Sequence, residues 1–98
     1  MKKAFQFDVL VIGTGVAGLA CALHLDKNLS IALISKGSLV DGSSWLAQGG
    51  IAAVLDEKDS IQDHVNDTLT AGDGLCHRDT VEFVVKNGEK TINWLVEQ

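Results

Sequence analysis

The sequence predicts an α/β fold in which a strand–helix–strand unit comes first and helices follow. Residues 7–12 and 31–34 are short apolar, β-branched runs that are typical of buried strands. Between them, residues 16–25 are rich in alanine and leucine and favour a helix. Strand, helix and strand in this order predict a parallel pair with a right-handed crossover.

Two helical segments are expected in the second half of the chain. Ser60 is a candidate N-cap with Asp63 completing a capping-box-like pair, and Gly72 or Gly74 would end that helix. Its apolar stripe consists of residues 61, 65 and 69. Asp79 and Glu82 repeat the cap pattern, and a helical segment with a break at Gly88 follows to the chain end. Residues 37–50 lack helical periodicity and are expected to form a functional loop.

Composition excludes several classes of protein. The chain has 98 residues, 46% hydrophobic and 21% charged, as expected for a soluble globular domain, and its net charge of -5 leaves no basic face for nucleic acid. Lys2 and Lys3 precede an apolar run, but Asp8 and a Gly-Thr-Gly interruption argue against a signal or membrane span. Two cysteines without a disulfide pattern suit a reducing cytoplasm.

Two strands form too small a sheet to be stable alone, and the apolar residues 94–96 have no C-cap after them. We therefore expect residues 1–98 to be the N-terminal part of a larger α/β domain whose later strands lie outside this chain.

The turn after the first strand has the pattern G-x-G-x-x-G at residues 13–18. In a dinucleotide-binding unit, Gly13 permits the tight turn and Gly15 lets the pyrophosphate approach the backbone. Gly18 brings the helix against the sheet and is not expected to contact the ligand. The amides of residues 14–17 would bind the phosphates, helped by the helix dipole. Because strand and helix flank the motif, it indicates a dinucleotide site.

One part of the usual dinucleotide site is missing. An acidic residue is expected about 20 residues further on, where it binds the ribose hydroxyls. Here the second strand ends in Ser35 and Lys36. A lysine there could meet the 2′-phosphate of NADP, or it could lie along the adenosine end of FAD, and the turn alone leaves both readings open.

A second motif is Ser43-Ser44-Trp45-Leu46-Ala47-Gln48-Gly49-Gly50 followed by Ile51. With Asp59-Ser60-Ile61, His64-Val65, Asp67-Thr68-Leu69, Ala71-Gly72, residues 81–84 and Trp94-Leu95, it resembles the succinate dehydrogenase/fumarate reductase flavoprotein family over nearly the whole chain. The resemblance is greatest to the aspartate-oxidising branch of that family. It implies a Rossmann-like FAD-binding domain, opened here by an incomplete parallel sheet and followed outside this chain by a substrate-capping domain.

The resemblance also implies which residues hold FAD. Residues 14–17 would cradle the pyrophosphate, Lys36 would lie at the adenosine end, and residues 43–50 would wrap the ribityl chain and flavin. Respiratory members bind flavin covalently through a histidine at the place of Ser43, so FAD is expected here without a covalent bond. Trp45 and Leu46 differ from the pair expected in that family. The expected cofactor-binding residues are Gly13, Thr14, Gly15, Val16, Ala17, Lys36, Ser43, Ser44, Trp45, Leu46, Ala47, Gln48, Gly49 and Gly50.

The function implied by the resemblance is oxidation of L-aspartate to iminoaspartate, with oxygen or fumarate as electron acceptor, in the first step of NAD biosynthesis. Quinolinate synthase is the implied candidate partner. The family's substrate arginines and histidines belong to the later capping domain, so no catalytic residue is expected here. The alternatives are another noncovalent flavoprotein of this family and a nonenzymatic nucleotide-binding module.

No metal site is expected. Cys21 with His24, and Cys76 with His77, fit no metal-ligand spacing, which favours buried cysteines and surface histidines. His64 is expected on a solvated helix face among acidic and amide side chains.

Overall fold

The structure is a computed structural model that describes residues 2–98. The chain divides into two compact units, one ending at Gly49 and the other running from Gly50 to Gln98.

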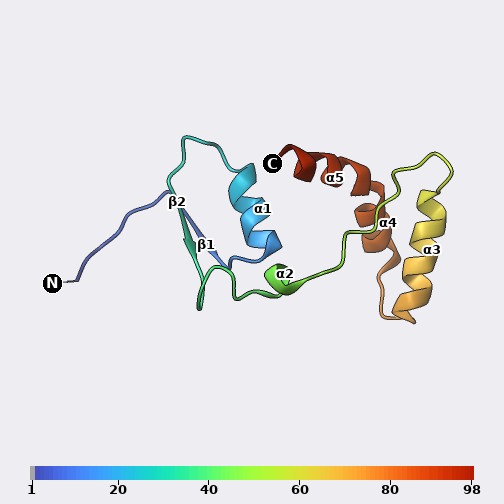
Figure 1. The fold of residues 1–98 in the computed structure, drawn as a ribbon, viewed down its shortest axis with the longest axis horizontal. Coiled ribbons are helices and arrows are strands. Elements are labelled where there is room, and N and C mark those ends of the chain that lie inside the picture. The colour runs from blue at the N-terminus through green and yellow to red at the C-terminus, as the bar shows by residue number, and fades with distance from the viewer. Residues whose placement is uncertain (1) are drawn as a thin grey trace. The chain divides into compact units, whose positions relative to one another are not determined.

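The first unit contains the predicted strand–helix–strand arrangement (Figure 1). Strand β1 (Val9–Ile12) pairs with strand β2 (Ile31–Ile34) in parallel, in the register Val9 with Ile31 through Ile12 with Ile34. Helix α1 (Val16–His24) connects them. The parallel pair is therefore confirmed, although β1 begins two residues later than predicted.

The start of the sheet is fixed by Asp8 and Ser30. The Ser30 amide and hydroxyl donate to Asp8 Oδ2 at 2.8 and 2.6 Å, and the Asp8 amide donates to the Ser30 carbonyl at 2.9 Å. These bonds hold the pKa of the Asp8 carboxyl below its ordinary value, the Ser30 hydroxyl having the largest effect. The two strands are thus joined at the end opposite to the glycine turn.

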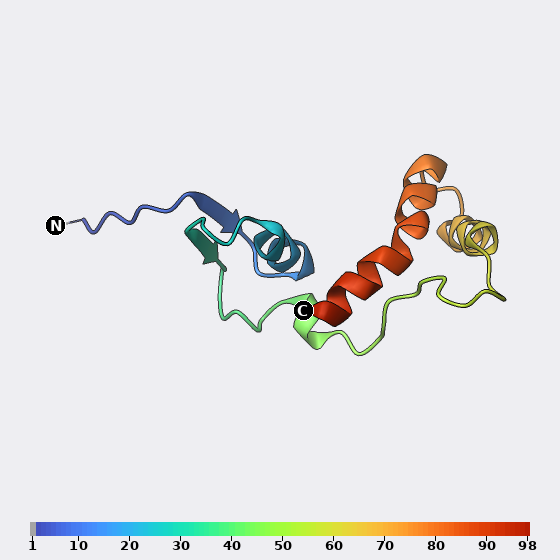
Figure 2. The ribbon, with the colours of Figure 1, turned by 90° about the horizontal axis from the view of Figure 1, so that it is seen from above.

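The two faces of the sheet differ in burial. Val11 is buried, and its side chain lies beside Gly18 of α1. Helix α1 lies next to the two strands in both ribbon views (Figure 1, Figure 2). Successive residues of a strand alternate between faces, so Leu10 and Ile12 lie on the opposite face, where they are 57% and 78% exposed. The prediction of fully buried strands was wrong for this face, because within this unit a helix covers one side of the sheet.

A short helix, α2 (Ser43–Leu46), corrects the prediction that residues 37–50 contain no helix. Four residues make about one helical turn, which is too short to produce an apolar repeat in the sequence.

The second unit is formed by helices α3 (Ile61–Gly72), α4 (Arg78–Lys86) and α5 (Gly88–Glu97). Helices α3 and α4 pack side by side around buried Val65 and Val85 (Figure 1). No helix within residues 2–98 is long and apolar enough to cross a membrane.

The predicted N-cap of α3 is confirmed, but its reciprocal half is not. Ser60 Oγ accepts a hydrogen bond from the Asp63 amide at 2.9 Å. The Ser60 amide donates to Asp59 Oδ1 at 2.8 Å, and so the neighbouring carboxylate takes the place expected for Asp63. The helix ends at Gly72 through Asp73, which has a left-handed conformation (φ 46°), and Gly74 (φ 85°).

The predicted cap of α4 was wrong. His77 is the N-cap, and Asp79 lies inside the first turn, where its carboxylate accepts from the Thr80 amide at 2.9 Å. Glu82 pairs with Arg78 and Lys86, each at 3.7 Å, instead of closing a capping box. The break before Gly88 is confirmed, with Asn87 separating α4 from α5.

Candidate functional site

The glycine turn joins the carboxyl ends of both strands. Gly13 has a φ of 112°, a conformation that L side chains rarely adopt. Its amide donates to the Ile34 carbonyl of β2 at 2.9 Å. Gly13 is therefore required for the shape of the turn, as its place in the motif predicts.

Gly18 allows α1 to pack closely on the turn. A Cβ at this position would clash with the Gly13 carbonyl oxygen and would lie 3.4 Å from Val11 Cγ1. This confirms the packing role predicted for the third glycine. Because α1 follows β1 through this turn, the N-terminus of α1 lies at the carboxyl end of the strand.

Gly15 is the N-cap of α1 and has a φ of -73°, which any residue can adopt. A Cβ there would meet Ser44 Oγ at 3.8 Å as its nearest neighbour. Gly15 therefore matters for the space that it leaves in front of the helix. The first amides of a helix lack intrahelical acceptors, and no acidic side chain lies in the first turn of α1. The turn thus fits a pyrophosphate group.

The serine-rich loop reaches this turn. The Val16 amide donates to Ser44 Oγ at 3.3 Å, across 28 positions of sequence. The structure thus brings together Val16 and Ser44, which were predicted to contact the same cofactor. The later predicted cofactor-binding residues of the second motif are exposed: Trp45 and Leu46 to 69% and 72%, and residues 47–49 as well. Gly50, the last of them, belongs to the second unit.

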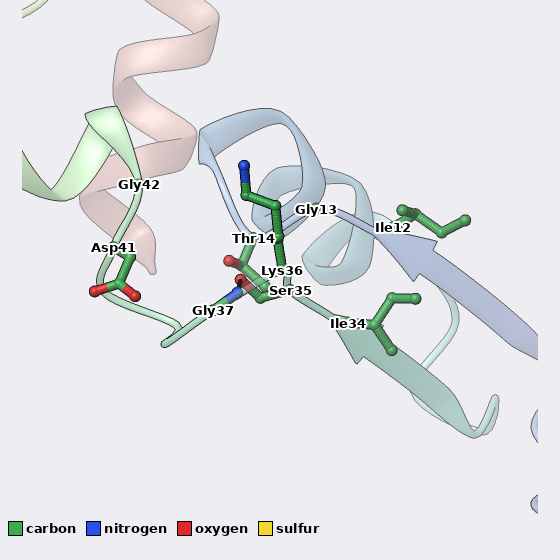
Figure 3. A pocket seen from close by; sticks show the side chains of 9 residues that line it. All are labelled: Ile12, Gly13, Thr14, Ile34, Ser35, Lys36, Gly37, Asp41 and Gly42. Carbon is green, nitrogen blue, oxygen red and sulfur yellow. Dashed lines mark hydrogen bonds between the residues drawn. The ribbon is translucent and has the colours of Figure 1, made fainter.

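A hollow of about 590 Å³ lies beyond the ends of the two strands (Figure 3). Three of the predicted cofactor-binding residues line it: Gly13, Thr14 and Lys36. A ligand crevice outside the carboxyl ends of parallel strands is the usual location in open α/β sheets. The remaining lining residues are Ile12, Ile34, Ser35, Gly37, Asp41 and Gly42.

Among the lining residues of this hollow that were not predicted as site residues, Asp41 is the charged one. The acid of a dinucleotide site is expected at the strand end, whereas Asp41 lies further along the loop that follows Lys36. An acidic residue in a loop rich in glycine and serine is a weak signal by itself. The folding of residues 37–42 back to the strand ends makes it part of the hollow.

Within residues 2–98 no group of histidine, cysteine and acidic side chains is arranged to hold a metal ion. Cys21 is exposed, which corrects the prediction of a buried cysteine, and Cys76 is half-buried with its Sγ 3.8 Å from the Thr68 carbonyl oxygen. His64 is half-buried and lines a hollow with Val84 and Val85, so its predicted solvated position was wrong.

Comparison with known proteins agrees with this geometry. Residues 8–98 match the FAD binding domain family, and the chain belongs to that family. FAD is the cofactor to which this family assignment points. The chain is 54% identical over 98 residues to the L-aspartate oxidase of Pseudomonas aeruginosa, covering 100% of the chain and 18% of that protein.

Further relatives show the same relationship. Identity is 52% over 91 residues to the L-aspartate oxidase of Yersinia pestis, covering 93% of this chain and 17% of that protein. The corresponding enzyme of Vibrio cholerae is 48% identical over 95 residues, with coverages of 97% and 18%. The chain thus spans less than a fifth of the length of these relatives.

Proposed function

We propose that residues 1–98 form the front of the FAD-binding domain of an enzyme that oxidises L-aspartate to iminoaspartate. The observation that carries this proposal is the glycine turn at the strand ends, with Ser44 of the second motif bonded to its helix N-terminus. Identity of about half to named L-aspartate oxidases supports the choice of substrate.

Each group of residues has a distinct part in holding the cofactor. The amides of residues 14–17 would bind the pyrophosphate, since they lie at the N-terminus of α1 with no acidic side chain in its first turn. The Val16 amide, which donates to Ser44 Oγ at 3.3 Å, would exchange that hydroxyl for a phosphate oxygen. Lys36 would lie beside the adenosine end, where its charge offsets a phosphate. Residues 43–50, which begin with α2, would enclose the ribityl chain and flavin, with hydroxyl and amide groups toward the polar edge.

FAD would be held without a covalent bond. A histidine linkage is the covalent mode of related respiratory enzymes, and Ser43 stands at that place. The chain has no histidine between His24 and His64. Denaturation should therefore release the yellow cofactor into solution.

The bound flavin would take the electrons from the substrate and pass them to oxygen or fumarate. The groups that bind L-aspartate would lie in a capping domain that follows these residues in the longer protein. Because free iminoaspartate hydrolyses, quinolinate synthase would be the partner that consumes it. The compartment would be the reducing cytoplasm, which suits a chain with two free cysteines.

Substitution of Lys36 distinguishes FAD from NADP as the ligand. In the whole protein, Lys36→Ala should weaken FAD binding by about two- to fivefold, as for loss of an exposed ion pair. NADP affinity should be negligible before and after the change. Lys27→Ala, which removes an exposed lysine beyond α1, is the matched control and should leave FAD binding unchanged. Tight NADP binding by the wild type that is lost in Lys36→Ala would contradict the proposal.

A further inference from the structure

We infer that Asp41 binds the vicinal hydroxyls of the adenosine ribose and thereby selects a nucleotide with an unphosphorylated 2′ position. This inference rests on the proposed FAD site and adds a residue that determines its specificity. It assigns the function of the missing strand-end acid to a residue of the following loop.

The first support is the position of Asp41. It lines the same hollow as Gly13 and Thr14 of the turn and Lys36 at the end of β2. Figure 3 shows Asp41 across this hollow from Ile34. In an adenine dinucleotide the ribose follows its phosphate by one methylene group. A ligand with its phosphates on the turn amides therefore has its ribose within the reach of this hollow.

The second support is the way the carboxylate is held. Asp41 Oδ2 accepts a hydrogen bond from the Ser38 amide at 2.8 Å. Gly37 leaves room for it, since a Cβ at that position would lie 2.7 Å from Oδ2. One oxygen is thus anchored, while Oδ1 has no hydrogen-bond partner among residues 2–98. An oriented carboxylate with a free oxygen is an acceptor suited to the two neighbouring hydroxyl donors of a ribose.

The third support is the balance of charge in the hollow. Within residues 2–98, neither Lys36 nor Asp41 forms an ion pair with a protein side chain. Lys36 alone would favour a 2′-phosphate as well as a pyrophosphate. Asp41 in the same hollow repels a dianion and attracts hydroxyl groups, so the pair favours a nucleotide charged on its pyrophosphate alone.

The experiment measures nucleotide affinities of the whole apoprotein, with ADP, 2′-deoxy-ADP and adenosine 2′,5′-bisphosphate as probes. The wild type should prefer ADP to 2′-deoxy-ADP by about tenfold, as for a hydrogen bond to a charged group. In Asp41→Asn that preference should fall to about twofold or less, and the bisphosphate should bind more tightly than to the wild type. Asp26→Asn, at the turn after α1, is the matched control and should keep the wild-type preference.

The ratio of affinities separates ligand recognition from loop structure. Loss of the Ser38 hydrogen bond alone would weaken all three probes equally and leave the ratio unchanged. An equal preference in wild type and Asp41→Asn, with FAD binding intact, overturns the inference and leaves the proposed function standing. A wild type that binds neither ADP nor FAD overturns both.

Discussion

Ser44 Oγ lies 3.3 Å from the Val16 amide and accepts its hydrogen bond at the first turn of α1. A hydroxyl oxygen in this place shows that the helix N-terminus accommodates an oxygen acceptor, the kind of atom that a phosphate presents. Gly15 lies beside the same hydroxyl, since a Cβ there would be 3.8 Å from it. Substitutions at Gly15 therefore test the space in which the pyrophosphate is proposed to lie.

Gly15→Val should abolish retention of FAD in the whole protein. The φ of -73° at Gly15 means that the reason is steric, because the branched side chain would extend into the space in front of the helix. Flavin absorbance of the purified protein measures the effect. Gly15→Ala is the matched control and should retain more FAD, since its Cβ reaches only ordinary contact with Ser44. A valine variant with a full complement of flavin would contradict the proposed position of the phosphates.

Gly18→Ala should destabilise the first unit by about 1–3 kcal/mol, because the new Cβ clashes with the Gly13 carbonyl oxygen. This loss opposes the gain of up to about 1 kcal/mol that alanine brings to a helix interior. Urea unfolding measures the difference. Gly42→Ala is the control, since a Cβ there meets no atom within 4 Å. Equal stability of both variants would show that α1 does not need its close approach to the turn.

Asp8 should make the stability of the first unit sensitive to acid. Its folded pKa is lowered by the bonds from Ser30, so the unfolded state binds more protons in the range between the folded and unfolded pKa values. The contribution is complete above the ordinary value of 3.8 and is lost as pH falls through the lower folded pKa. Denaturation measured from pH 7 downward should show a smaller acid-dependent loss in Asp8→Asn. An identical pH profile in the two proteins would contradict the role of the Asp8–Ser30 bonds.

The isolated 98-residue chain should be a marginal fold without oxidase activity. Apolar side chains such as Ile12, Leu75 and Val96 are 78–90% exposed, which favours self-association. The residues proposed to hold FAD would enclose only part of the cofactor. Arg78, the one arginine of the chain, is paired with Glu82. Assay with L-aspartate and added FAD should yield no hydrogen peroxide. Substantial peroxide from a cooperatively melting monomer would place the catalytic groups within these residues.

Local sequence was sufficient for the elements whose causes are local. Short apolar runs, the conformational needs of Gly13 and the side-chain cap at Ser60 act within a few residues. The turn and the cap are found where they were predicted, and the first strand begins two residues later than predicted. Interactions for which several neighbouring side chains compete were harder to predict. Asp59, and not Asp63, accepts the hydrogen bond of the Ser60 amide, because either carboxylate can satisfy that donor. Glu82 forms ion pairs with the nearby Arg78 and Lys86 and closes no capping box.

The sequence by itself determined a parallel strand pair, a glycine turn that suits a pyrophosphate and a helix capped by Ser60. Only the tertiary structure brought Ser44 to the Val16 amide, Asp41 to the hollow beside Lys36 and His64 into contact with an apolar hollow. These relationships join residues that are far apart in sequence or lie in irregular loops. The hydrophobic periodicity of the sequence does not predict these contacts, because they depend on how the loop returns to the strand ends and on which helix faces pack together.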